Sequence, residues 1–187
     1  MRSSKTLLGL SLAGSLLALA PDASAGCGGR PGAVVADLGL HVVNFGYQRA
    51  LGCYVTLQAT GGLYVPWTVS SDVFGLGGGR DGSITVGGLG LRARAFVHPL
   101  GTAPAGLWIS PFVQGGVVRA NPPSGDLYGP AFAAGLSVGW TWHLGERWLL
   151  GLGLGAQYHR VSFQGSTDAP GFSRLGPTVD INVAYRL

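Results

Sequence analysis

An alternation of large apolar and small side chains runs through residues 131–160 and constrains this chain more than any other feature. The large residues at every second position are Phe132, Leu136, Val138, Trp140, Trp142, Trp148, Leu150, Leu152, Leu154 and Tyr158. Because successive side chains of a strand point to opposite faces, the stretch predicts a β-hairpin with one apolar face and one small, polar face. In water the apolar face would need a partner sheet, whereas in lipid it needs none. We interpret the hairpin as two strands of a membrane-spanning β-barrel.

The composition agrees with a barrel in lipid. Charged residues make up 11% of the 187 residues, against about 25% in an ordinary soluble domain. Glycine, with 34 copies, takes their place, and small residues suit a narrow lumen. The net charge of +4 is too small to indicate a nucleic-acid partner.

The N-terminus has the pattern of an export signal. Residues 1–5 are basic, residues 7–20 are apolar, and Ala23-Ser24-Ala25 is a small-residue cleavage site. We expect a signal peptide over residues 1–25, a short periplasmic lead over 26–32, and a single barrel domain over 33–187. No later segment offers about 20 uninterrupted apolar residues, so a transmembrane helix is not predicted.

Two cysteines leave three alternatives open. Cys27 and Cys53 fit an oxidising compartment and could form a disulfide, or both could be free thiols. The third alternative is a lipid on Cys27, since Ser24-Ala25-Gly26 supplies the small residues that lipoprotein processing needs.

The strand count follows from the turns. Seven extended segments alternate between short connections and longer loops at 68–81, 120–130 and 163–176, as outer-membrane barrels do. The segment 33–48 changes parity at Val42-Val43, which predicts a turn or bulge and hence an eighth strand. The predicted fold is therefore all-β, an antiparallel up-and-down transmembrane barrel of eight strands. The facing of 107–119 stays open, because Trp108 and Phe112 oppose an equally apolar face.

Aromatic residues are spaced as two girdles. Trp148 and Tyr158 share a face ten positions apart, which spans ~34 Å along a strand, or ~26 Å along the normal at ~40° tilt. The apolar band of such barrels is ~25 Å tall. We predict Trp142, Trp148 and Tyr185 in the periplasmic ring, and Trp67 and Tyr158 in the outer one.

The last strand carries a family resemblance. Val179, Ile181, Val183 and Tyr185 point outward and the chain ends at Leu187. With the signal peptide and the loop pattern, this resembles the small eight-stranded outer-membrane barrels of Gram-negative bacteria, the OmpA/OmpX/OmpW-like group. The resemblance implies residence in the outer membrane, contact with its lipids, and recognition of the last strand by the barrel-assembly machinery. It implies no particular activity, and members of the group usually end in Phe or Trp where this chain has Leu187.

Motifs that could carry chemistry have structural explanations. The G-x-G-x-x-G at 77–82 is followed by a strand where a dinucleotide site needs a helix, and the G-x-S-x-G at 135–139 places Ser137 within a strand. The four histidines show no metal-ligand spacing. We predict no catalytic, metal or cofactor site, and expect the protein not to be an enzyme.

The inward charges form the most informative set. Arg92, Arg94, Arg186 and Asp180 all fall on the predicted lumen face. A buried charge in a narrow barrel needs a partner, so we expect Asp180 to bond at least one of the arginines. The set could be a structural plug or line a narrow anion-preferring path.

Two function classes follow. The leading hypothesis is a monomeric outer-membrane protein with a structural, adhesive or interaction role through its outer loops. The alternative is a secreted, soluble, lipocalin-like barrel that binds an apolar ligand. That alternative would place charges outside and apolar residues inside, the reverse of the pattern above.

Overall fold

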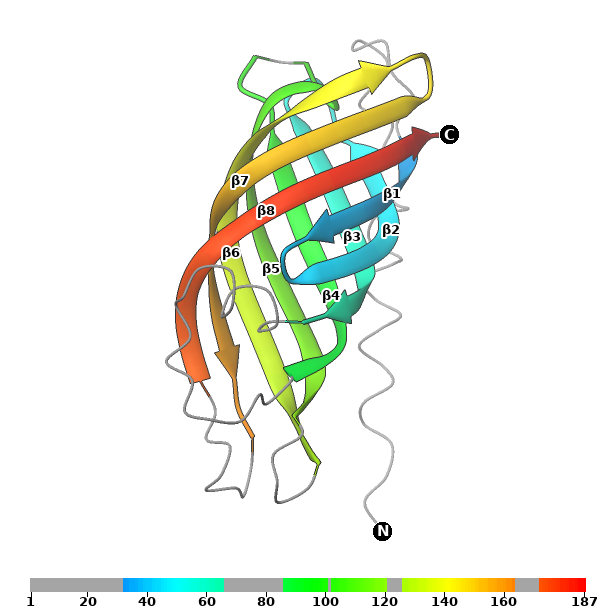
Figure 1. Cartoon of the computed structure of the whole chain (residues 1–187). Coiled ribbons are helices and arrows are strands. Elements are labelled where there is room, and N and C mark those ends of the chain that lie inside the picture. The colour runs from blue at the N-terminus through cyan, green and yellow to red at the C-terminus, as the bar shows by residue number, and fades with distance from the viewer. Residues whose placement is uncertain (1–31, 66–85, 101, 121–125, 164–171) are drawn as a thin grey trace.

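Eight antiparallel strands close into one barrel, which confirms the predicted fold class. The computed structural model describes residues 32–65, 86–100, 102–120, 126–163 and 172–187. The predicted signal peptide, the lead before Gly32, Cys27 and Trp67 lie outside these residues. Each strand pairs with its sequence neighbours, and β1 pairs with β8 to close the barrel (Figure 1). The strands are β1 (Gly32–Gly39), β2 (Val42–Ala50), β3 (Val55–Tyr64), β4 (Val86–Val97), β5 (Gly106–Ala120), β6 (Leu127–Leu144), β7 (Trp148–Val161) and β8 (Phe172–Arg186).

A two-residue turn at Leu40 and His41 explains the change of parity in the first apolar segment. It separates β1 from β2, with Gly39 paired to Val42. Asp37 is buried on β1, whereas Val42 is buried on β2. The predicted eighth strand therefore exists, and β1 and β2 together form a short hairpin.

Two strands extend beyond their predicted ends. β6 begins at Leu127 and β8 at Phe172, so the loops predicted at 120–130 and 163–176 are too long. Their proline and glycine residues suggested loops, but Pro130 pairs with Val117 and Pro177 pairs with Ala156. Pairing with neighbouring strands overrides the local turn signal. The loop predicted at 68–81 lies outside the described residues.

The two ends of the barrel differ. The N–H of Leu187 donates to the carbonyl of Gly32 at 3.0 Å, so the described chain starts and finishes at the same end. We call this the terminal end; it also carries the connections 51–54, 98–105 and 145–147. The opposite end, the loop end, carries the 40–41 turn and the connections 65–85, 121–126 and 162–171, two of which are the longest in the barrel.

The barrel is apolar outside and polar inside. The most exposed large side chains on its wall include Leu89, Leu154 and Leu175, each at 67–68%. Arg92 and Asp180, by contrast, are 2% and 0% exposed. This is the reverse of a soluble protein and is typical of a barrel wall in lipid. The described residues include no helix that is long and apolar enough to cross a membrane.

Glycines on β6 and β7 make room for an aromatic ring from β5. Trp108 and Phe112 both point into the lumen, which settles the facing of this strand. A Cβ added to Gly139 or Gly153 would overlap the Trp108 ring, and one added to Gly135 would overlap Phe112. Part of the high glycine content is thus a packing requirement of the lumen.

Candidate functional site

Four charged residues meet in the middle of the lumen and define what we call the ion cluster: Asp37, Arg92, Arg94 and Asp180. Arg92 Nη1 lies 3.1 Å from Asp37 Oδ2, and Arg92 Nη2 lies 3.0 Å from Asp180 Oδ1. Arg94 Nη1 lies 3.5 Å from Asp37 Oδ1, and Arg94 Nη2 lies 3.0 Å from Asp180 Oδ2. The two positive charges of the arginines equal the two negative charges of the aspartates, and their mutual pairing offsets the cost of burying each charge.

Neighbouring strands complete the surroundings of the arginines. Arg94 donates from Nε to Ser110 Oγ at 3.1 Å and from Nη2 to Ser137 Oγ at 2.8 Å. The Arg92 guanidinium carbon lies 4.0 Å from the centre of the Phe112 ring. Strands β1, β4, β5, β6 and β8 thus all contribute to one packed centre, as expected for a stabilising network.

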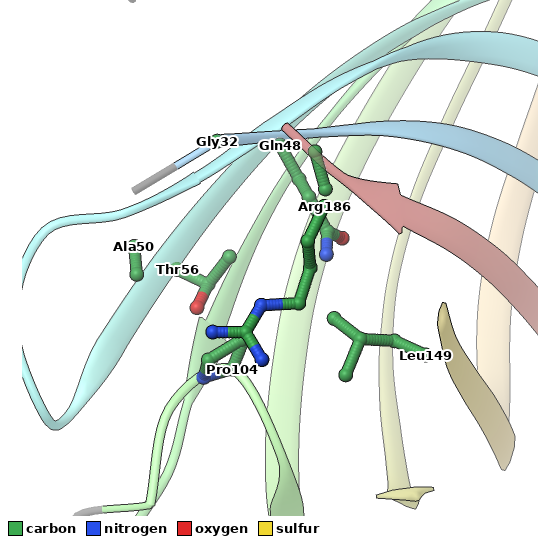
Figure 2. Close-up of a pocket in the computed structure, with 8 residues that line it drawn as sticks. Gly32, Gln48, Ala50, Thr56, Pro104, Leu149 and Arg186 are labelled. Carbon is green, nitrogen blue, oxygen red and sulfur yellow. The ribbon is translucent and has the colours of Figure 1, made fainter. Parts of the chain in front are cut away.

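The predicted lumen set is only partly brought together. Arg92, Arg94 and Asp180 meet, but Arg186 lies at the mouth of the terminal end, 3.5 Å from the carbonyl of Glu146. Its side chain points into a small pocket there (Figure 2), whose volume of about 10 Å³ is near the minimum for one water. Expecting Arg186 in the cluster was wrong, because sharing the inward face does not place two residues at the same depth. Asp37, which is fully buried on β1, was missing from the predicted set.

The lumen is filled on both sides of the ion cluster. Toward the terminal end, Gln58 donates to Asn182 at 3.4 Å and Trp108 donates to Thr141 at 3.0 Å. A small apolar group closes this end: Ala33, Val35, Leu149 and Ala184.

Toward the loop end, the Tyr64 hydroxyl and His159 Nδ1 share a hydrogen bond of 2.8 Å. The His41 ring meets His159 edge-on at 4.7 Å. Small apolar side chains, among them Val118, Ala131 and Val161, form a buried cluster at this end of the lumen.

The predicted aromatic girdle residues lie on the outer face where they are described. Trp142, Trp148 and Tyr185 cluster at the terminal end, and the Trp148 and Tyr185 rings meet edge-on at 5.0 Å. Tyr158 lies nearer the loop end and pairs with Leu175. Trp140, Phe45 and Tyr128 add exposed aromatics that the prediction did not include.

The remaining candidates can be placed in the described part of the chain. Ser137 accepts a hydrogen bond from Arg94 within β6, and the described residues hold no group of three metal-ligating side chains. Cys53 is disulfide-bonded. Because Cys27 lies outside the described residues, the pairing of these two cysteines stays a prediction.

Comparison with known proteins yields little. No protein-family model and no curated protein matches the chain. Among solved structures, the crystal structure of CarO from Acinetobacter baumannii is similar at 14% identity and a TM-score of 0.45. The match covers 84% of this chain and 98% of that one. A resemblance this weak supports no conclusion about activity or location.

Proposed function

We propose that this chain is an integral outer-membrane β-barrel protein without catalytic activity. In this proposal it serves a structural, adhesive or interaction role through the segments that leave the loop end. The observation that carries the proposal is the inverted distribution of polarity. Large apolar side chains cover the outer wall, while two arginines and two aspartates are buried at its centre. Only an apolar solvent around the barrel makes this arrangement favourable.

The dimensions support the same proposal. Along β7, Trp148 and Tyr158 are separated by ten residues, a rise of ~26 Å along the membrane normal at ~40° tilt. This matches the ~25 Å apolar band between the aromatic girdles of such barrels. In this orientation the terminal end faces the periplasm and the loop end faces outward.

The packed centre argues against the two alternatives. A lipocalin-like protein would hold its ligand in an apolar interior, but the middle of this lumen is charged and hydrogen-bonded. An anion-preferring path would need an unpaired positive charge. Here Arg92 and Arg94 are balanced by Asp37 and Asp180 and packed against Phe112.

Partners of the proposed protein follow from its outer face and last strand. Ile181 of β8 is exposed at 37%, and Leu187, which directly follows β8, is exposed at 56%. Under the proposal these contact lipid in the mature barrel, and the same strand is presented to the barrel-assembly machinery before insertion.

Extraction from membranes tests the proposal. The purified protein should require detergent to stay monodisperse and should change its gel mobility on boiling, because a folded barrel stays compact in cold dodecyl sulfate. A folded, monodisperse sample in plain buffer, with the tryptophans shielded from an aqueous quencher, would contradict it.

A further inference from the structure

A pocket at the terminal end of the lumen lies apart from the ion cluster. Arg186 of β8 pairs with Ala33 of β1, and Ala33 pairs in turn with Gln48 of β2, so these three residues form one row across the inner wall. Thr56 of β3 and Leu149 of β7 line the same pocket. Figure 2 shows the Arg186 side chain extending into the space between Thr56 and Leu149. We call this space the mouth pocket.

The Arg186 guanidinium brings a positive charge to the mouth pocket without an acidic partner among the described residues. Its Nη1 lies 3.5 Å from the backbone carbonyl of Glu146, and its Nε is buried with no hydrogen-bond partner. Within the described ranges Arg186 forms no salt bridge. One N–H donor and the charge of the guanidinium therefore stay available to a ligand.

Thr56 brings a second unused donor. The residue is 2% exposed, and its Oγ1 has no hydrogen-bond partner. Buried hydroxyl groups are normally hydrogen-bonded, and a hydroxyl can rotate its hydrogen toward an acceptor that enters from the side. The mouth pocket thus offers an O–H and a charged N–H to the same small space.

The rest of the lining limits the size of the ligand group. Ala33, Leu149 and Pro104 contribute apolar surface, and the first two are buried. The volume of about 10 Å³ admits a single water-sized group. Apolar walls of low dielectric constant concentrate the field of a charge between them. The pocket therefore suits one oxygen atom of a ligand whose remainder stays outside.

The charge around the pocket has the same sign as Arg186. At the terminal end, Glu146 is the sole acidic side chain of the described residues, whereas Arg49, Arg147 and Arg186 are cations. An excess of positive charge at one mouth raises the local concentration of anions. This end of the barrel should therefore attract small anions from solution.

We propose that the mouth pocket binds the carboxylate group of a small aliphatic acid. One carboxylate oxygen accepts hydrogen bonds from Arg186 Nε–H and Thr56 Oγ1–H. An ionised carboxylate accepts hydrogen bonds without donating any, and its charge strengthens the bond to a guanidinium. A water molecule would satisfy Thr56 but would leave the charge of Arg186 without a counterion. The site goes beyond the proposed function, and only its access from the periplasm depends on the proposed orientation.

An NMR titration of the full-length mature protein in detergent micelles tests the mouth pocket, with acetate as the probe. Two groups at the pocket serve as reporters, the side-chain Nε–H of Arg186 and the backbone N–H of Ala50, which also lines it. Acetate should shift both resonances in a saturable way. Acetamide, which has a similar shape but no charge, and sodium chloride at the same ionic strength should cause no saturable shift.

A matched pair of variants isolates the hydroxyl. Thr56→Val keeps the side-chain shape and removes the hydroxyl. Thr60→Val makes the same change four residues further along β3, at a residue that is also buried with an unpartnered Oγ1 but does not line the pocket. Neither change breaks a hydrogen bond within the described residues, so both variants should fold. Acetate affinity should fall at least about threefold in Thr56→Val and stay at the wild-type level in Thr60→Val.

Removal of the charge should have the larger effect. In Arg186→Gln, followed through the Ala50 N–H, acetate affinity should fall roughly tenfold or more, because the charge-assisted bond is the stronger of the two.

Three results would overturn the mouth pocket as a carboxylate site. They are no saturable shift with acetate in wild type, the same shift with acetamide or chloride, and equal acetate affinity in Thr56→Val and Thr60→Val. Each of them leaves the membrane location intact. A protein that is folded and monodisperse without detergent would instead overturn the proposed function and leave the pocket in place.

Discussion

Arg94 and Asp180 are 86 residues apart in the sequence, yet their side chains meet at 3.0 Å in the centre of the barrel. One comes from β4 and the other from β8, on opposite sides of the β1–β3 wall. Their contact ties the two walls together across the lumen. Asp180 also lies 3.0 Å from Arg92, so both arginines of the ion cluster depend on its carboxylate.

Removal of this carboxylate should destabilise the barrel strongly. Asp180→Ala leaves Arg92 and Arg94 with one aspartate between them, and breaking a buried pair costs about 3–5 kcal/mol. Urea unfolding in micelles, followed by tryptophan fluorescence, measures the change in free energy of unfolding. Arg186→Gln, at the mouth, serves as the control and should cost less than about 1 kcal/mol. Equal effects of the two substitutions would contradict a central role for the cluster.

Enlarging Gly153, against which the Trp108 ring packs, should also destabilise the barrel. Gly153→Ala places a methyl group against the ring and should cost about 1–3 kcal/mol by overpacking. Gly115→Ala is the control, because a Cβ at this position on β5 meets nothing within 4 Å. Pairing Gly153→Ala with Trp108→Leu should recover most of the loss, and a strictly additive double-mutant cycle would argue against direct contact.

The free energy that an arginine on the outer wall costs should depend on its depth in the bilayer. Leu152 lies near the middle of β7, paired with Trp140 and Ile181, and is 42% exposed. Leu152→Arg should cost about 2–4 kcal/mol in a bilayer, whereas Leu144→Arg at the strand end should cost about 0–1 kcal/mol. The measurement is denaturant unfolding in phospholipid vesicles. If both arginines are tolerated equally, the wall does not face hydrocarbon.

The lumen should not conduct. Because the ion cluster, Phe112 and Trp108 fill its centre, planar bilayers containing the wild-type protein should show no single-channel steps. Anion-selective steps in the wild type that vanish in Arg92→Ala would instead favour the narrow anion path.

His98 should make stability depend on pH. It lies in the connection after β4, outside the spanning strands, and its Nδ1 is 3.1 Å from the carbonyl of Ala105. Burial lowers the pKa of His98 below 6.5, and bonds to the carbonyls of Ala105 and Leu107 offset part of this. Below pH 6.5 the unfolded chain therefore binds the proton more readily, so the His98 contribution to stability is lost as pH falls.

His98→Gln should flatten the part of the profile that this residue causes. Comparing the unfolding midpoint of wild type and His98→Gln between pH 7.5 and pH 5 isolates the effect from that of the other histidines. Parallel profiles for the two proteins would assign the pH dependence elsewhere.

What the sequence determined by itself was the facing of most strands. Alternation is local, so the outward leucines and tryptophans of β6 and β7 and the inward Arg92, Arg94 and Asp180 could be assigned without coordinates. The turn at 40–41 was also readable, as a change of parity. These features were enough for the closed eight-stranded barrel and for the inverted polarity.

Only the tertiary structure decided which inward residues meet. Depth in a barrel depends on strand tilt and register, which neighbouring strands set together. Asp37 therefore joined the ion cluster and Arg186 did not, although both face inward. Trp108 went inside because Gly139 and Gly153, on two other strands, leave space for its ring. The length over which β8 pairs with β1 likewise depends on how far β1 extends beside it, a property of the pair that neither strand encodes alone.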